Sequence, residues 1–113
     1  MKRIEIIIPH RMLGYAHAIL KDVNVGGMSH YRIEGSGRVK PQPVTAARGT
    51  SQTQPEYIPR TKIEVVVKDE QVEELISKIA DKLGSSELGG KIFVIDIPIA
   101  VDIATKKRGE DAI

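Results

Sequence analysis

Apolar residues recur at every second position in four stretches of this sequence and at helical spacing in two stretches between them. The alternation predicts strands over residues 4–8, 28–34, 62–67 and 91–97, the last with a short extension over 99–103. The helical spacing predicts helices over residues 12–23 and 69–83. The order is strand–helix–strand, repeated once. It predicts an α+β fold of the ferredoxin-like βαββαβ type, a two-layer sandwich with both helices on one face of an antiparallel sheet.

The second predicted helix has polar residues that suit its two ends. Asp69 is placed to cap the N-terminus by accepting hydrogen bonds from free backbone N–H groups. Glutamates follow in the first half, and Lys78 and Lys82 lie towards the end, which matches the helix dipole. Gly84 follows the last apolar residue. We therefore expect a helix that is capped by Asp69 and ended by Gly84.

The composition argues against several classes of protein. Lysine and arginine number 17 against 15 acidic residues, and a net charge of +2 is too small to predict a nucleic-acid partner. The absence of cysteine excludes disulfides and thiolate metal ligands. The first apolar run is broken by Glu5 and ends at Pro9, too soon for a signal sequence or a membrane span. We expect a cytoplasmic protein without direct membrane insertion.

No set of residues predicts catalysis or a metal site. His10, His17 and His30 have no ligand spacing with one another or with acidic residues. The acidic residues cluster on the second helix as a solvated face, and no Ser–His–Asp or paired-carboxylate arrangement can be argued. We expect a protein that acts by binding partners and not as an enzyme.

The segment between the second and third strands, residues 35–59, shows neither the alternation of a strand nor the apolar spacing of a helix. It contains Pro41, Pro43, Pro55 and Pro59, four of the six prolines of the chain. A hairpin needs only about 2–5 residues to turn, and loops beyond about 15 residues are uncommon in compact domains unless they are functional or disordered. The segment predicts a binding loop, with a flexible insertion as the alternative.

Two glycine-rich segments are each followed by a basic residue. Residues 35–38 leave the second strand and end in Arg38, and residues 88–91 enter the last strand and end in Lys91. Glycines let backbone N–H groups approach an anion closely, and the flanking cation supplies the counter-charge. Together the segments predict a phosphate-binding cradle, although each alone is equally typical of a turn.

Six motifs occur along the chain in this order: Met1-Lys2-Arg3-Ile4, Gly27-Met28-Ser29, Gly35-Ser36-Gly37-Arg38, Pro59-Arg60-Thr61-Lys62-Ile63-Glu64-Val65-Val66-Val67, Gly90-Lys91-Ile92-Phe93-Val94-Ile95-Asp96, and Gly109-Glu110 with Ala112-Ile113. With these motifs the chain resembles the PII signal-transduction family (GlnB/GlnK type) over its whole length, as a divergent member. Residues 1–113 would form a single PII-like domain, with the long loop, at about 37–58, as the T-loop of the family.

The resemblance implies a regulatory homotrimer with ATP or ADP as reversible ligands in clefts between subunits, and no tightly bound cofactor. The T-loop would dock on an ammonium transporter, a metabolic enzyme or a transcription factor and so control nitrogen or carbon metabolism. The apolar alternation of Phe93, Ile95 and Ile97 also predicts that both faces of the sheet are covered, as in a homotrimer.

The residues implied in nucleotide binding are Gly27, Met28, Ser29, Gly35, Ser36, Gly37, Arg38, Glu64, Val66, Gly89, Gly90 and Lys91. Partner docking is predicted for Arg48, a lone guanidinium between Ala47 and Gly49, and for Thr50 and Ser51 near the tip of the loop.

Several positions depart from the family pattern. Val39 stands where members usually have the glutamine that holds magnesium and 2-oxoglutarate, so we expect that effector not to bind. Two basic residues that face nucleotide phosphates in the family correspond to Asp102 and Ala104, and the first glycine of the second cradle is Leu88. Lysines and an arginine follow over 106–108, in a tail expected to be mobile.

These departures leave two alternatives to an ATP- or ADP-responsive regulator. The cleft is retuned to another small ligand, such as an AMP-type nucleotide or bicarbonate, or the chain is a CutA-like structural trimer. The long proline-rich loop and the two cradles favour a regulator over the structural trimer.

Overall fold

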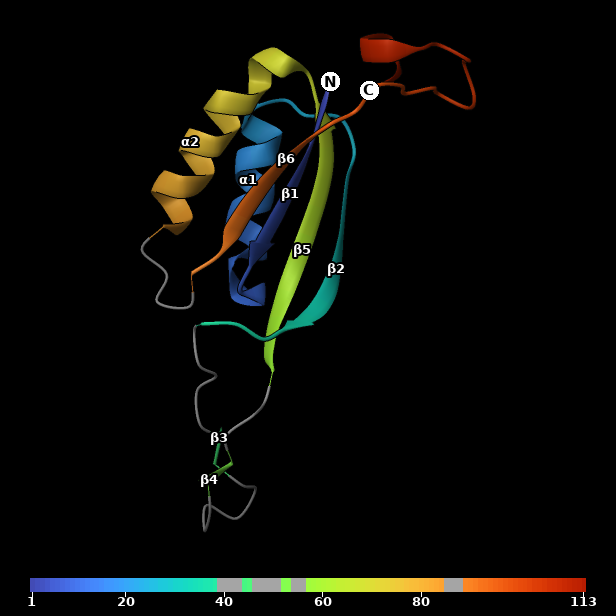
Figure 1. The fold of residues 1–113 in the computed structure, drawn as a ribbon. Helices are drawn as coiled ribbons and strands as arrows, with labels where there is room; N and C mark the ends of the chain where they lie inside the picture. The colour runs from blue at the N-terminus through green and yellow to red at the C-terminus, as the bar shows by residue number, and fades with distance from the viewer. Residues whose placement is uncertain (39–43, 46–51, 54–56, 85–88) are drawn as a thin grey trace.

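The centre of the fold is an antiparallel sheet of four strands in the order β2-β5-β1-β6 (Figure 1). Its strands are β1 (Lys2–Ile8), β2 (Met28–Gly35), β5 (Ile58–Val67) and β6 (Lys91–Asp96). This is a computed structural model, and it describes residues 1–38, 44–45, 52–53, 57–84 and 89–113. Since β1 pairs with both β5 and β6, the first strand of the sequence lies inside the sheet.

Two helices, α1 (Leu13–Asp22) and α2 (Val72–Leu83), pack side by side on one face of the sheet (Figure 1). Alternate residues of β1 and β5 meet the apolar stripes of both helices there. The core residues are Ile4, Ile6, Ile8, Ala16, Leu20, Val23, Ile63, Val65, Val67, Val72, Leu75, Ile79 and Leu83. The predicted ferredoxin-like α+β fold is therefore confirmed. None of the helices in the described ranges is long and apolar enough to cross a membrane.

The third predicted strand begins earlier than the alternation indicated. β5 starts at Ile58, four residues before the predicted start at 62, and its first residues pair with the end of β2 as far as Gly35↔Ile58.

Most of the predicted T-loop lies outside the described residues. Within it, β3 (Val44–Thr45) and β4 (Gln52–Thr53) form a separate two-stranded ladder.

The expected strand extension over 99–103 is wrong. β6 ends at Asp96, and Val101 forms only an isolated bridge with Arg108. The tail turns back on itself because the Asp102 N–H donates to the Lys107 carbonyl at 2.9 Å and the Gly109 N–H donates to the Ala100 carbonyl at 2.9 Å. This tail hairpin, residues 100–109, is hydrogen-bonded, contrary to the expectation of a mobile tail.

The expected capping role of Asp69 is also wrong. Asp69 opens a short 3-10 turn, Asp69–Gln71, and its carboxylate instead accepts from the N-terminal ammonium of Met1 at 2.8 Å. Gln71 closes the turn, because its side-chain oxygen accepts from the Lys68 N–H at 3.0 Å. Gly84 does follow α2, where its N–H donates to the Ala80 carbonyl at 2.8 Å, as the sequence predicted.

The ion pair between Met1 and Asp69 predicts a loss of stability in acid. The hydrogen bond from the ammonium of Met1 holds the pKa of Asp69 below its usual value of 3.8 in the folded chain. A depressed carboxyl pKa adds stability above the unfolded pKa, and this stability is lost as pH falls through the folded pKa.

We therefore expect Asp69→Asn to unfold at lower denaturant concentration than the unchanged chain at pH 7, with a difference that shrinks as pH falls through the lowered pKa of Asp69. Urea titrations across this pH range would measure it, with Asp81→Asn on the exposed face of α2 as the control. A difference that does not vary with pH would contradict the assignment.

Candidate ligand-binding site

Five of the predicted nucleotide-binding residues meet where β2 begins and β5 nears its end. Ser29 pairs with Glu64 and Met28 with Val65 in the β2–β5 ladder, and Gly27 precedes β2. We call Gly27, Met28, Ser29, Glu64 and Val66 the turn-side cluster. All except Met28 line a cavity of about 320 Å³. This volume lies near the lower end of the range for ligand pockets.

The other predicted residues lie elsewhere in the same chain. Gly35 pairs with Ile58, six residues along β5 from Glu64, or about 20 Å at 3.3 Å per residue. Ser36, Gly37 and Arg38 continue from there and with Gly35 form the loop-side cluster. Gly89, Gly90 and Lys91 enter β6, the opposite edge strand from β2. Edge strands separated by two others lie about 14 Å apart. The chain thus holds the predicted residues in three separate places.

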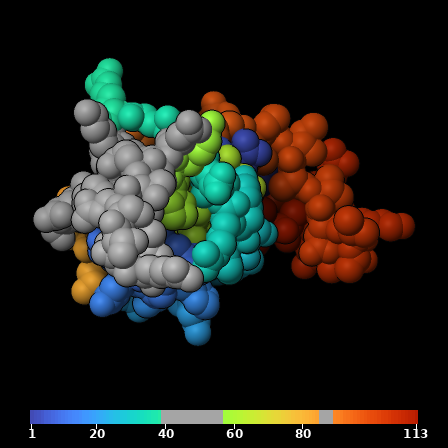
Figure 2. Space-filling view, turned by 90° about the horizontal axis from the view of Figure 1, so that it is seen from below, coloured from blue at the N-terminus to red at the C-terminus, as the bar shows by residue number. Residues whose placement is uncertain are grey.

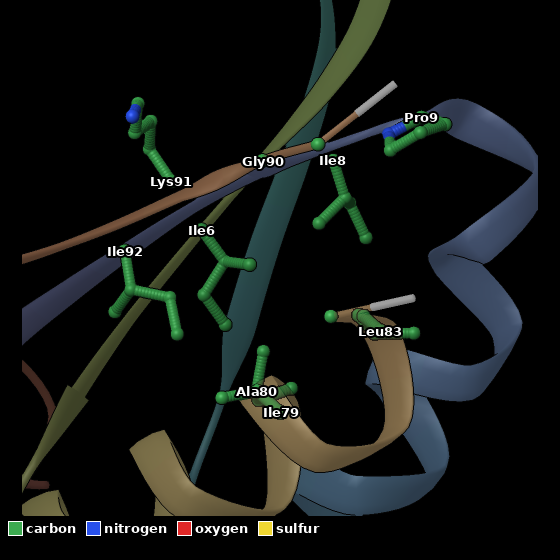
Figure 3. Close-up of a pocket in the computed structure, with 11 residues that line it drawn as sticks. Ile6, Ile8, Pro9, Ile79, Ala80, Leu83, Gly90, Lys91 and Ile92 are labelled. Carbon is green, nitrogen blue, oxygen red and sulfur yellow. The ribbon is translucent and has the colours of Figure 1, made fainter. Parts of the chain in front are cut away.

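The start of β6 borders a second cavity, of about 360 Å³, between the sheet and the end of α2 (Figure 3). Its walls are apolar, with Ile6, Ile8 and Ile92 pointing towards Leu83, whereas Lys91 points away from them. Gly90 has no room for a side chain, because a Cβ there would lie 2.7 Å from the Ile7 carbonyl oxygen. Gly89 has a φ of 69°, which also favours glycine.

Charged side chains on the face without helices connect to the turn-side cluster. The Tyr31 hydroxyl donates to Glu64 at 2.9 Å, and Lys62 Nζ lies 3.5 Å from Glu64 and 3.2 Å from Glu5. The Tyr31 hydrogen bond, with the charge of Lys62, lowers the pKa of Glu64. Arg3 Nη2 lies 3.8 Å from Glu5. Glu64 is therefore an ionised acceptor beside the cavity.

Asp102, one of the positions that depart from the family pattern, has a structural role in the tail. The Asp102 carboxylate accepts from the Ala104 and Thr105 N–H groups at 2.8 and 2.9 Å, and these bonds lower its pKa. Its charge thus stabilises the tail hairpin. Arg60 is only 8% exposed, and burial, with the charge of Arg11, lowers its pKa.

Five predicted or discussed positions lie outside the described residues: Val39, Arg48, Thr50, Ser51 and Leu88. Sequence reasoning also missed six residues near the turn-side cluster. The cavity is also lined by Arg3, Gly26, Val65, Ala112 and Ile113, and Lys62 pairs with Glu64. Lys62 could have been found, since it is two residues from Glu64 in an alternating strand. No local signal placed Ala112 and Ile113 there, because they are distant in sequence.

An antiparallel sheet of four strands with two helices on one face defines a ferredoxin-like domain, a class with many functions. The family model described as nitrogen regulatory protein P-II matches residues 1–107. Over 114 aligned positions that cover both chains fully, the sequence is 36% identical to a nitrogen regulatory protein P-II of Pasteurella multocida and 34% identical to those of Haemophilus influenzae and Rhodobacter capsulatus. The chain belongs to the nitrogen regulatory protein P-II family.

The close approach of Gly90 to β1 predicts a site-specific loss of stability. Gly90→Ala would place a methyl group against the Ile7 carbonyl and should lower the free energy of unfolding by about 1–3 kcal/mol. Gly27→Ala is the matched control, because a Cβ there meets no atom within 4 Å. Urea unfolding of both variants at equal protein concentration would measure the effect. Equal stability of the two variants would rule out the steric requirement.

Proposed function

We propose that this chain is a regulatory protein that works as a homotrimer, takes an adenine nucleotide at sites shared between neighbouring copies, and docks on a protein target through its T-loop. Membership in the nitrogen regulatory family supports a regulatory role in nitrogen metabolism. The target would be a transporter, a metabolic enzyme or a transcription regulator.

The proposal of a shared site rests on one observation, which is that the predicted binding residues lie in separate places within one chain. The turn-side cluster carries an ionised carboxylate and lines a cavity, whereas the basic residues Arg38 and Lys91 belong to the two other groups. A nucleotide that contacts all three groups needs the turn-side cluster of one copy and the basic groups of another. Its phosphates would lie at Arg38 and Lys91, because an ionised Glu64 disfavours them.

The uncovered face of the sheet supports the assembly. Phe93 on that face is 48% exposed, and Ile99, Val101 and Ile103 on the tail are 64%, 47% and 94% exposed. Figures 1 and 2 place the tail, in orange to red, on the β2 side of the sheet, projecting beyond the body. Apolar surface of this kind is a liability in an isolated chain and favours association with further copies.

Mixed trimers provide a test of the shared site. Lys91→Ala removes a basic group, and Gly27→Leu fills the turn-side cavity from a position with open space around it. Each variant alone should bind ADP weakly. Trimers refolded from a mixture should regain ADP binding, because each mixed trimer pairs one intact turn-side cluster with one intact set of basic groups.

Titration calorimetry would measure binding, and light scattering would check that each species has three times the 12.4 kDa chain mass. Mixing that restores no binding would place the site within one copy. A mass near that of a single chain would end the trimer proposal.

Val39 predicts the absence of one effector response. An isopropyl side chain has no atom that can coordinate Mg²⁺. Calorimetric titration of 2-oxoglutarate into the protein with Mg-ATP should give no binding heat. Val39→Gln should introduce binding if the rest of the site is intact. A clear signal from the unchanged chain would show that another group supplies the ligand.

Removing much of the long loop should separate docking from folding. Deletion of residues 43–55 leaves the four-stranded sheet and its core complete. We expect unchanged trimer mass and thermal midpoint, with loss of binding to the physiological target in a pull-down. If the deletion unfolded the trimer, the docking role would lose its main support.

A ligand with fewer phosphates is a second candidate. Asp102 is a carboxylate that accepts hydrogen bonds within its own turn, and because it is negatively charged this position supplies no counter-charge to a triphosphate. AMP binding that is tighter than ATP binding would favour this alternative.

A further inference from the structure

Glu64 is held on the face of the sheet without helices by a side chain that lies outside the cavity. Tyr31 of β2 is paired with Lys62 of β5, and Glu64 is the diagonal neighbour of Tyr31 on the same face. Side chains at diagonal positions of an antiparallel pair can reach each other, and the Tyr31 hydroxyl donates to Glu64 Oε1 at 2.9 Å. Tyr31 does not line the cavity and is not among the residues implied in nucleotide binding.

Tyr31 is the closest partner of Glu64 in the part of the chain that the structure describes. Lys62 Nζ contacts the same oxygen, Oε1, at 3.5 Å, but it lies nearer to Glu5, at 3.2 Å, so its charge is shared between two carboxylates. The Tyr31 ring also lies beside Lys62, with Nζ 5.9 Å from the ring centroid, which is within the distance of a cation–π contact. One side chain thus contacts both the carboxylate and its counter-ion.

These contacts leave one oxygen of the carboxylate for a ligand. Tyr31 and Lys62 both contact Oε1, so Oε2 remains as an acceptor beside the cavity that Glu64 lines. The hydrogen bond from Tyr31 is the main cause that lowers the pKa of Glu64, and the charges of Lys62 and Arg3 act in the same direction. A charged acceptor makes a stronger hydrogen bond than a neutral one.

We propose that Tyr31 is a positioning residue for the ligand site: its hydroxyl fixes one oxygen of Glu64, keeps the carboxylate ionised, and leaves the second oxygen to a donor group of the ligand. The inference rests on the proposed nucleotide site. It adds a residue outside the cavity that sets the pH range over which the site binds. Without this hydroxyl, Glu64 would take up a proton at higher pH, and the ligand would lose its charged acceptor.

The pH dependence of binding tests this role. Tyr31→Phe removes the hydroxyl and keeps the ring beside Lys62. We expect the variant to bind ADP a few-fold more weakly than the unchanged chain at neutral pH, and to lose binding at a higher pH as the solution is acidified. Titration calorimetry between about pH 4 and pH 7 would measure both effects.

Tyr15→Phe is the matched control, because Tyr15 is exposed on α1 and its ring contacts Lys82. The control should follow the unchanged chain at every pH. A purely structural role of Tyr31 would lower the affinity by the same factor at every pH, and this result would overturn the inference.

A second measurement needs no ligand. The NMR signal of the Glu64 carboxyl carbon, assigned by its disappearance in Glu64→Gln, reports the protonation of Glu64 in the free protein. Its titration midpoint should be higher in Tyr31→Phe than in the unchanged chain or in Tyr15→Phe. Equal midpoints would overturn this inference and leave the nucleotide site standing. Absence of ADP binding to the unchanged chain would overturn both the nucleotide part of the proposed function and the role of Tyr31 in it.

Discussion

The pairing of β1 with two neighbours is the constraint on which the rest of the structure depends. Ile4, Ile6 and Ile8 are at most 3% exposed because β1 lies inside the sheet and both helices cover its apolar face. A slip of one residue would turn these side chains to the open face and bring Arg3 and Glu5 into the core. The same register sets Lys62 beside Glu5 and so organises the charges on the open face.

Most of the fold was predictable, because the alternation of apolar residues in the strands and their helical spacing in the helices can each be read within a short stretch of sequence. The start of β5 was not, since Ile58-Pro59-Arg60 does not alternate and contains a proline. The ladder explains why proline is accepted: β1 reaches only to Thr61, so Pro59 has a partner strand on one side alone. The role of Asp69 was missed because its partner is the N-terminal ammonium, far away in sequence.

The site was predicted as a set of residues but not as a geometry. Glycine and basic residues indicate where an anion can approach, but they do not tell which edge of a sheet each segment reaches. The strand order places Lys91 on one edge and Gly35 on the other, and the register separates Gly35 from Ser29 along β2. Ala112 and Ile113 could not be included, because only the tail hairpin brings the chain back towards Gly26.

The charges on the face of the sheet without helices determine how much burial of that face would contribute to the stability of an assembly. Arg3 and Lys62 balance Glu5 and Glu64, and the pairs already form within one chain. A second copy could therefore cover this face without leaving an unpaired carboxylate, which would cost several kcal/mol. Desolvation of the paired charges still offsets much of the gain from covering Phe93 and its apolar neighbours. Such a face is better suited to fixing the register of an assembly than to making it very stable, and a site shared between copies requires a fixed register.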